Sequence, residues 1–594
     1  MIYIGQVILR VDLSSDRIEE EELPDSVVEK FVGGKGLATY LLYKEVKPGI
    51  DPLSPENKLY IFGGPLALIY PTFTRTIIVS KSPLTGLYCD SNAGGSFSIE
   101  LRRAGYIGIV VEGKSNKMKC LKITREEKRL IECEALRSKT TYEVGEFFRD
   151  YSVLTIGPAG ENLVRFANIT IDMRRNPVFR PGVAGRCGLG AVMGSKNLKA
   201  IVVKGWLRPD DLSRGINEKT MRELINRYMK ILQDDVVPGI GVGGNLPVFR
   251  VSAEAKILPV KNFRAGSHER WEELVDEKWG KITIKRLSCP TCPLRCGTTV
   301  AEEDSSTERI EYETVAMNGS NLMIISRKAL IEINNALNAL GLDSITMGNV
   351  AGFLMELSEK SLLKDYRISW GDAEGYLKLI YDVAYRRGIG ELLAEGVARA
   401  AKRLNAEEYA VHIKQLEIPA YDPRGVPGMA LAYATADRGG DHLRAWTVAA
   451  EVSSRLALED LVNLTKYLQD RNAALWTLVA CDNIPSNSIR PPDEMIKIYI
   501  SMLNTLGFNY DEESFLKLGE RIYNLSRLFN VREGVSRKDD SLPPRFHEPR
   551  EDTGWVITKE DFNKMLNIYY EKRGWSPEGI PLKETLERLG LSDI

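Results

Sequence analysis

Three cysteines lie within eight residues of one another, and this short loop constrains the chain more than any other feature. The segment reads Cys289-Pro-Thr-Cys292-Pro-Leu-Arg-Cys296. Thiolates at this spacing, completed by a fourth donor elsewhere, are typical ligands of an iron–sulfur cluster. A structural zinc site usually repeats a cysteine pair, and no second pair is present here. The loop therefore predicts an iron–sulfur cluster, with a zinc ion or three unliganded cysteines as the alternatives.

The fourth cluster ligand is left open by the spacing alone. The other cysteines are Cys89, Cys120, Cys133, Cys187 and Cys481. Eight cysteines in 594 residues are too few for a disulfide scaffold. We therefore expect reduced cysteines and a cytoplasmic protein, a setting that suits an oxygen-sensitive cluster.

The charge and hydropathy of the chain argue against two classes of partner. The formal net charge is −1, whereas proteins that neutralise nucleic-acid phosphates are strongly basic. No apolar run approaches the roughly 18–20 residues of a membrane span. Residues Met1 to Gln6 lack the basic and apolar regions of a signal peptide. We expect neither a nucleic-acid partner nor a membrane partner.

The first third of the chain has the pattern of a β-rich domain. Short branched or aromatic runs, separated by Gly, Pro or Asn, predict strands at 7–11, 59–62, 76–79, 107–111, 121–124 and 200–203. Helices are expected at 35–43 and 97–104. The runs lack the steady strand–helix alternation of a doubly wound sheet.

After about residue 209 the apolar residues follow a helical period. Apolar faces recur at 221–232, at 330–340 with Gly341 as the C-cap, and at 515–529. The predicted fold class is α+β, with a β-rich domain over 1–208 followed by two mainly α-helical domains. The domain over 209–412 contains the cysteine loop, and the last domain spans 413–594.

Three glycine-rich clusters in the N-terminal part predict a ligand that carries phosphate. The first is Phe31 to Gly36, and the third is Ala184 to Lys196. The second consists of Thr74 to Thr76, Lys81 to Gly86 and Ser91 to Gly95. Glycine lets a backbone approach a ligand closely, and the nearby Arg and Lys residues suit phosphate groups. Ordinary β-turns are the alternative for each cluster taken alone.

These clusters and the cysteine loop resemble, in type and order, those of the tungsten-containing aldehyde:ferredoxin oxidoreductases. The resemblance runs nearly from end to end, and further segments that carry it are Tyr312 to Thr314, Gly341 to Asp343, Pro419 to Gly425, Arg438 to Ala445 and Asn530 to Gly534. It implies a tungsten (or molybdenum) bis-molybdopterin cofactor, with Mg²⁺ joining the two pterin phosphates. It also implies a 4Fe-4S cluster beside one pterin.

The resemblance implies a role for particular residues. The implied cluster ligands are Cys289, Cys292, Cys296 and Cys481. Arg75 matches the residue between pterin and cluster, and Arg444 is expected to line the pocket. The positions that match contacts to pterin or its phosphates are Asn92, Gly94, Gly185, Arg186, Leu342 and Asp343.

Two departures from the family pattern concern the pterin motifs, each of which begins with Asp in the family. Asn338 stands at that position in the first motif, and Trp476 stands there in the second. An Asn side chain still donates and accepts hydrogen bonds, whereas a Trp cannot replace a carboxylate. The second motif keeps only Cys481, so pterin contacts from this segment are not carried over.

Glu313 and His442 are predicted to lie over the metal, because both fall within the family-like segments. A carboxyl group and an imidazole at that place can move protons as substrate becomes product. The implied reaction is the oxidation of a small aldehyde to a carboxylic acid, with electrons passing through the cluster to ferredoxin. The alternatives are the reverse low-potential reduction of an acid or an activated aromatic ring, and a non-catalytic iron–sulfur electron-transfer subunit.

A homodimer is a further possible assembly. Some family members bind a metal between two subunits through Glu and His, and Glu332 matches the Glu. No His lies between His268 and His412, so we do not expect that metal site. A homodimer would therefore rest on other contacts.

Overall fold

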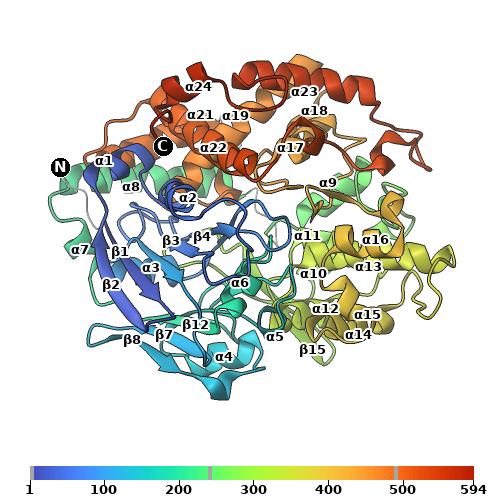
Figure 1. Ribbon diagram of the computed structural model, residues 1–594, viewed down its shortest axis with the longest axis horizontal. Helices are drawn as coiled ribbons and strands as arrows, with labels where there is room; N and C mark the ends of the chain where they lie inside the picture. The colour runs from blue at the N-terminus through green and yellow to red at the C-terminus, as the bar shows by residue number, and fades with distance from the viewer. Residues whose placement is uncertain (1–5, 239–243, 487–491) are drawn as a thin grey trace.

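Two six-stranded β-sheets form the first third of the chain. The structure, a computed structural model, describes residues 6–238, 244–486 and 492–594 (Figure 1). The first sheet has the strand order β2-β1-β6-β3-β4-β5, and its strands are β1 Val7–Asp12, β2 Arg17–Glu22, β3 Leu59–Phe62, β4 Thr76–Lys81, β5 Tyr88–Ala93 and β6 Gly108–Glu112. The second has the order β11-β10-β9-β12-β7-β8, and its strands are β7 Lys119–Ile123, β8 Lys128–Glu132, β9 Ser152–Thr155, β10 Ile169–Ile171, β11 Gly182–Ala184 and β12 Leu198–Val203.

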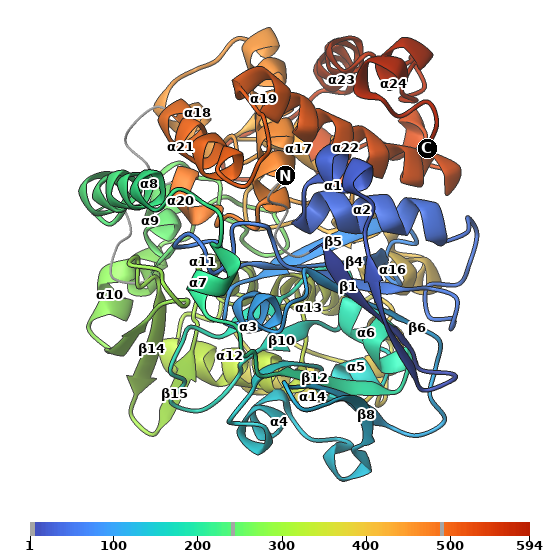
Figure 2. The same cartoon turned by 90° about the vertical axis from the view of Figure 1, so that its left-hand side faces the viewer.

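The central strands of both sheets are buried on both faces, which explains their continuous branched and aromatic runs. Every residue of β3, β4 and β12 is buried. The helices of this part are α1 Asp25–Phe31, α2 Gly34–Glu45, α3 Phe97–Arg103, α4 Thr141–Phe147, α5 Pro158–Glu161 and α6 Leu189–Ser195. Helix α6 packs between β3–β4 of the first sheet and β12 of the second, as Figure 2 shows. The predicted strands and the two predicted helices are thus confirmed.

One expectation about the cysteines is wrong. Cys120 on β7 and Cys133 after β8 are joined in a disulfide rather than reduced. Strands β7 and β8 pair antiparallel, so the hairpin brings these two buried side chains together. This bond removes both cysteines from the candidates for the fourth cluster ligand.

The remainder of the chain is mainly helical, as predicted, and the α+β class is confirmed. Its helices are α7 Pro209–Leu212, α8 Glu218–Ile231, α9 Pro247–Glu254, α10 Asp276–Gly280, α11 Tyr312–Asn318, α12 Arg327–Leu340, α13 Ser344–Glu359, α14 Ala373–Ala384, α15 Ile389–Leu393, α16 Val397–Leu404, α17 Pro427–Thr435, α18 Val448–Ser453, α19 Leu458–Thr477, α20 Asn483–Ser486, α21 Pro492–Asn504, α22 Glu512–Arg532, α23 Lys559–Arg573 and α24 Lys583–Leu589. The predicted C-cap Gly341 ends α12 with a φ of 77°. The boundaries at 208 and 412 stay predictions. No helix among the described residues is long and apolar enough to cross a membrane.

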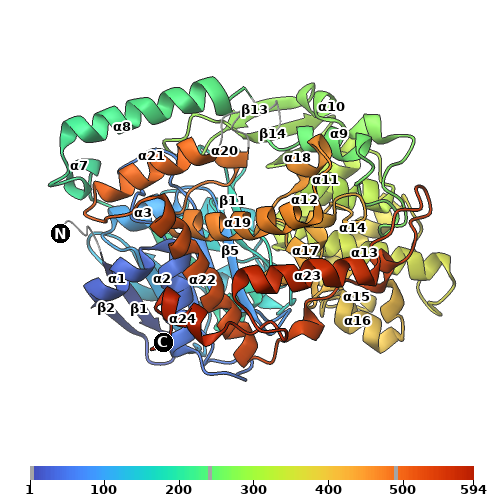
Figure 3. The same cartoon turned by 90° about the horizontal axis from the view of Figure 1, so that it is seen from above.

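Segments far apart in the sequence lie side by side in the helical part. Figure 3 shows α8 next to α21, and the Tyr228 and Tyr499 hydroxyls are 3.1 Å apart across this contact. Helix α2 packs on β3 and β4 with one side and on α19 and α22 with the other. Helix α2 therefore joins the first sheet to the C-terminal helices.

A three-stranded sheet within the helical part was not predicted, and it holds the cysteine loop. Its order is β13-β14-β15, with β13 Thr283–Leu287, β14 Gly297–Glu302 and β15 Ser305–Glu308. The loop with the three cysteines joins β13 to β14, whose antiparallel pairing ends at Leu287 and Gly297. The sheet therefore fixes both ends of the loop.

The first glycine cluster packs against the backbone at the end of α19, and the ligand predicted for it stays a prediction. Gly34 has a φ of +35°, and a Cβ there would lie 2.3 Å from the Trp476 carbonyl oxygen. A Cβ on Gly64 would lie 2.5 Å from the Leu478 carbonyl oxygen. Only glycine allows such an approach to the carbonyl end of α19. The contact places Cys481, which follows α19, against the first sheet.

Helices α19 and α22 form a close pair that a single methyl group should disturb. A Cβ on Gly519 would lie 1.8 Å from the Asp470 carbonyl oxygen of α19, a backbone atom that cannot turn away. We expect Gly519→Ala to destabilise the protein by about 2 kcal/mol, within the usual range for overpacking. Thermal unfolding at a fixed scan rate checks this. Buried Gly63, where a new Cβ would meet its nearest neighbour at 3.5 Å, is the matched control, and equal melting temperatures for both variants would contradict the argument.

Candidate cofactor cavity and cysteine cluster

A buried cavity lies where the two N-terminal sheets meet the helical part. Its volume is about 160 Å³, and most of the side chains that line it are polar or charged. Eight of the predicted site residues line it, namely Arg75, Asn92, Gly185, Arg186, Glu313, Leu342, Asp343 and His442. These residues span 368 positions of sequence, from 75 to 442, so the cavity exists only in the folded chain.

The local structure explains why these side chains point into the cavity. Glu313 is the second residue of α11, and Asp343 is the N-cap of α13, where its carboxylate accepts the Ile345 N–H at 3.0 Å. The other oxygen of Asp343 lies 3.1 Å from the Arg186 guanidinium. The cap and the ion pair together fix Arg186 at one wall of the cavity.

Many polar atoms on the cavity wall are buried without a hydrogen-bond partner among the described residues. They are Arg75 Nε, Asn168 Oδ1, Arg180 Nε, Arg186 Nη1, Arg309 Nε, Glu313 Oε1, Asn338 Nδ2 and Arg438 Nε. A buried donor or acceptor without a partner costs about 1–3 kcal/mol, and so many in one place indicate a missing polar ligand. Most of the atoms are cationic donors, so the ligand is anionic.

Glu313 and His442 face each other in this cavity. His442 Nε2 lies 3.7 Å from Glu313 Oε1, and the Ala420 N–H donates to Glu313 Oε2 at 3.0 Å. Burial raises the pKa of Glu313 to about 8, and the Asp343 and Asp441 charges add to this. Burial lowers the pKa of His442 to about 4. At neutral pH the pair is therefore a protonated carboxyl group beside a neutral imidazole.

The four predicted cluster cysteines are brought together by the fold. The Gly95 N–H donates to Cys289 Sγ at 3.4 Å, and Arg75 Nη2 donates to Cys481 Sγ at 3.4 Å. Burial raises the pKa of Cys292, and the nearby Cys289, Cys481 and Cys296 charges raise it further. All four thiols are partly exposed, whereas Cys89 and Cys187 are buried elsewhere.

Arg75 connects this thiol group to the cavity. Its guanidinium contacts Cys481 and lies 3.4 Å from Asp482, while the residue also lines the cavity. Burial lowers the pKa of Arg75, but the Cys481 and Asp482 charges outweigh this and raise it above its ordinary value. Arg75 thus stays charged between the two sites.

Two predicted residues do not line the cavity. Gly94 lies at the thiol group instead, where a Cβ would come within 2.8 Å of Cys289 Sγ. Arg444 is buried in an ion network with Asp437, at 2.6 Å, and with Asp90. The network also includes Lys35, whose ammonium lies 2.9 Å from Asp90 and 2.8 Å from Asp437. Arg444 therefore supports the cavity from behind.

Trp476, which stands where a carboxylate was expected, contacts this ion network. Its indole N–H donates to Asp482 Oδ1 at 2.5 Å. Its ring lies 5.0 Å from the Arg444 guanidinium and 5.3 Å from the Lys35 ammonium. Asp482 itself lines the cavity, so a carboxylate is present near the position of the missing one.

Sequence reasoning missed several residues of the cavity. Arg180 and Arg309 line it, and both form ion pairs with Glu311. Each lies within six residues of a recognised segment, and Asp482 directly follows Cys481. Proximity to those segments was the available signal, since none of the three has a motif of its own.

Comparison with known proteins agrees with this arrangement over nearly the whole chain. Residues 8–205 match the family described as aldehyde ferredoxin oxidoreductase, N-terminal domain, and residues 223–591 match its domains 2 and 3. The tungsten-containing aldehyde ferredoxin oxidoreductase of Pyrococcus furiosus is 37% identical over 99% of this chain and 98% of its own. The Thermococcus kodakarensis protein of the same name is 36% identical, with the same coverage.

More distant relatives have other activities in their names. The WOR-like subunit of an aliphatic sulfonate oxidoreductase from Pyrococcus furiosus is 31% identical over 100% of this chain and 97% of its own. A solved structure of the active site complex BamBC of benzoyl coenzyme A reductase, with 1,5-dienoyl-CoA, superposes with a TM-score of 0.84. That chain is 25% identical and is covered to 98%, against 100% of this one. The resemblance inferred from the motifs is confirmed, and the chain belongs to the aldehyde ferredoxin oxidoreductase family of oxidoreductase enzymes.

Proposed function

We propose that this enzyme oxidises a small aldehyde to a carboxylic acid at a tungsten bis-pterin centre and passes the electrons through a 4Fe-4S cluster to ferredoxin. The observation that carries the proposal is the position of Arg75. Its side chain reaches from the cavity of Glu313 and His442 to the cysteine group. Glu313 and His442, which would transfer protons, thus lie close to the cysteines, which would transfer electrons.

The residues of the cavity suit the cofactor. The unpartnered donors of Arg75, Arg180, Arg186 and Arg438 would hold pterin phosphates, with Mg²⁺ between the phosphates near Asn92 and Gly185. Asn338 Nδ2, a buried donor without a partner among the described residues, would hydrogen-bond a pterin ring. When bound, the tungsten–pterin group supplies the two-electron oxidation, and the chain supplies position and proton transfer.

The thiol group would hold a four-iron cluster, because three cysteines of one loop and a fourth from elsewhere are a usual ligand set. Among the described residues, no three His, Cys, Asp or Glu side chains are grouped so as to hold a single metal ion. The Gly95 N–H at Cys289 Sγ and the Arg75 charge at Cys481 would stabilise the bound thiolates.

The protonation states of the catalytic pair suggest a role for each residue. Glu313 carries its proton at neutral pH, so it donates a hydrogen bond to the aldehyde oxygen. His442 is neutral and accepts a proton from the water that becomes the second carboxyl oxygen. Aldehyde and water thereby give the acid, two protons and two electrons.

The reverse reduction of an acid or an activated aromatic ring is the second candidate. The structural likeness to a benzoyl coenzyme A reductase complex favours it, at 25% identity. The 37% identity to an aldehyde ferredoxin oxidoreductase favours aldehyde oxidation. Assays of the purified protein with an aldehyde and an oxidised dye, and with an acid and a reduced dye, separate the two directions.

The first test concerns Glu313. We expect Glu313→Gln to keep its tungsten and pterin but to lose roughly 10²–10⁴-fold in turnover, as when a positioned acid is removed. Because the raised pKa keeps the carboxyl group protonated below pH about 8, wild-type activity should fall as pH rises through that value. The activity of the Glu313→Gln variant should not show this decrease at high pH. Aldehyde oxidation measured against pH, with metal content determined in parallel, checks both points. Full activity in the variant at equal metal content would remove Glu313 from the mechanism.

The second test concerns the fourth cluster ligand. We expect Cys481→Ser to lose about one iron atom in four and to bleach the cluster absorbance, since its thiolate is the distant ligand. Iron analysis and electron paramagnetic resonance measure the loss. Cys187→Ser is the matched control, because Cys187 is buried apart from the thiol group. Unchanged iron in Cys481→Ser would show that another donor completes the site.

A further inference from the structure

Three large apolar side chains lie exposed in the segments next to the cysteine loop. Val178 is 80% exposed, Phe179 39% and Ile284 65%. They make up a quarter of the twelve large apolar side chains that the described residues expose. Contiguous exposed apolar side chains mark interaction sites, whereas single ones need no explanation.

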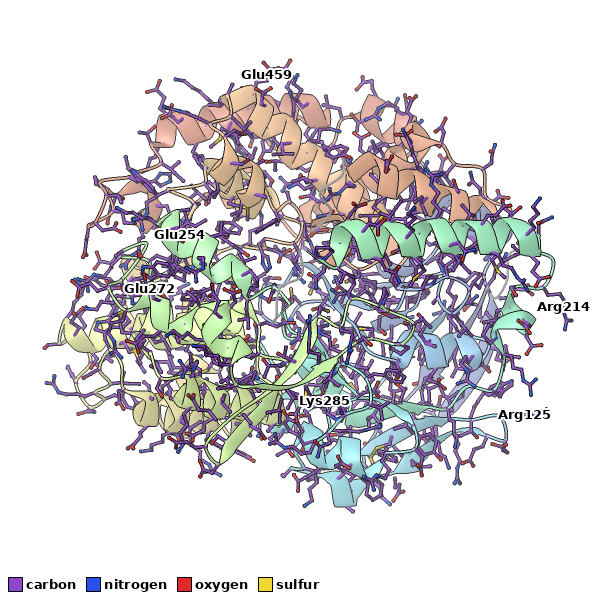
Figure 4. The ribbon with its side chains drawn as sticks, turned by 180° about the vertical axis from the view of Figure 1, so that it is seen from behind. Arg125, Arg214, Glu254, Glu272, Lys285 and Glu459 are labelled. Carbon is purple, nitrogen blue, oxygen red and sulfur yellow. A yellow bond between two sulfur atoms is a disulfide. The ribbon has the colours of Figure 1, made fainter. Side chains whose placement is uncertain are left out.

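Two hydrogen bonds bring these side chains to one place although they come from different segments. The Lys285 ammonium donates to the Pro177 carbonyl at 2.9 Å. The Arg180 N–H donates to the Ser288 carbonyl at 2.8 Å. These bonds tie the residues on either side of Val178 and Phe179 to β13 and to the start of the cysteine loop. The view from behind in Figure 4 shows Lys285 on this side of the molecule.

A β-bulge in β13 explains why Ile284 is exposed beside Lys285. The register with β14 runs from Thr283 opposite Val300 to Lys285 opposite Thr299, so Ile284 has no partner of its own. A bulge of this kind interrupts the alternation of side chains and turns one of them outward. Ile284 and Lys285 are both exposed as a result.

The charge around these apolar side chains has one sign. The segment 281–296 contains four basic and no acidic residues. Lys285 and Arg295 are both exposed, and neither forms an ion pair in the described parts of the chain. The Arg286 guanidinium donates to the Arg295 carbonyl at 3.2 Å and so holds the loop in place.

The other end of the same sheet is different. Its acidic residues Glu302 and Glu303, at the β14–β15 turn, are paired with Arg327 at 2.7 Å and Lys328 at 2.6 Å. Among the described residues, Lys285 and Arg295 therefore give the part of the sheet beside the cysteine loop positive charge without a carboxylate partner.

We propose that this surface docks a small acidic one-electron carrier protein of the ferredoxin kind. The surface, here named the carrier face, consists of Val178, Phe179, Ile284, Lys285, Arg286 and Arg295. An apolar centre with a charged rim is the usual build of a transient protein interface, and the rim charges steer an oppositely charged partner. The exposed Arg295 adjoins Cys296, so a docked carrier lies next to the cluster ligands. This inference rests on the proposed function, because it takes the cysteines to hold the cluster.

The test is a charge reversal on the carrier face. We expect Lys285→Glu to raise the KM for an acidic 4Fe-4S ferredoxin about tenfold through the loss of electrostatic steering. The salt dependence of that KM should also weaken. Aldehyde oxidation with benzyl viologen, a small dye that needs no docking surface, should equal that of the wild type. Arg125→Glu is the matched control, since Arg125 is an exposed cation between β7 and β8, away from this face, with no ion pair among the described residues (Figure 4).

A second variant and a second measurement keep the outcomes distinct. Val178→Ser lies on the other segment of the face and should also weaken binding of ferredoxin, measured by titration calorimetry on the iron-loaded protein without turnover. Unchanged ferredoxin binding and kinetics in both variants would overturn the carrier face. If the wild type itself did not oxidise aldehydes with the dye, the proposed function would be wrong. The calorimetry would still test whether ferredoxin binds at the carrier face.

Discussion

The buried ion network of Lys35, Asp90, Asp437 and Arg444 is the constraint on which the rest of the structure depends. All four side chains are at most 1% exposed, and each cation contacts both carboxylates. Removing charges from water costs several kcal/mol per ion, and only close, complete pairing offsets this. The network therefore forms only when helix α2, strand β5 and the loop after α17 are all in place. That loop carries His442, and β5 carries Asn92, so the same condition builds the cavity.

The ion network explains why a tryptophan fits at position 476. A carboxylate at that position would have faced two cations already neutralised by Asp90 and Asp437. The indole ring instead covers Lys35 and Arg444, and its N–H orients Asp482 toward Arg75. One substitution thus connects the network behind the cavity to the arginine that reaches the cysteines. At this departure from the family pattern, Trp476 covers the two cations and Asp482 supplies a carboxylate beside the cavity.

Local signals in the sequence were enough for part of the elements, and tertiary contacts decided the rest. Strand β3 was predicted with its observed ends because four branched or aromatic residues are followed by two glycines. Strands β13 to β15 were missed because they carry Thr, Ser, Lys and Arg without alternation. The eight cavity-lining residues that were predicted came from short motifs. Arg444 was assigned to the cavity because its motif says nothing of Asp90, which lies 354 residues earlier.

The close approach of Gly34 and Gly64 to the carbonyl end of α19 has a consequence for how the enzyme matures. The glycines sit near the start of the chain, and the helix end they require lies beyond residue 470. During synthesis the first sheet can form this contact only after most of the chain has been made. Such non-local contacts close slowly and late. The cavity, which His442 and Asp482 line, is likewise complete only after most of the chain has been made.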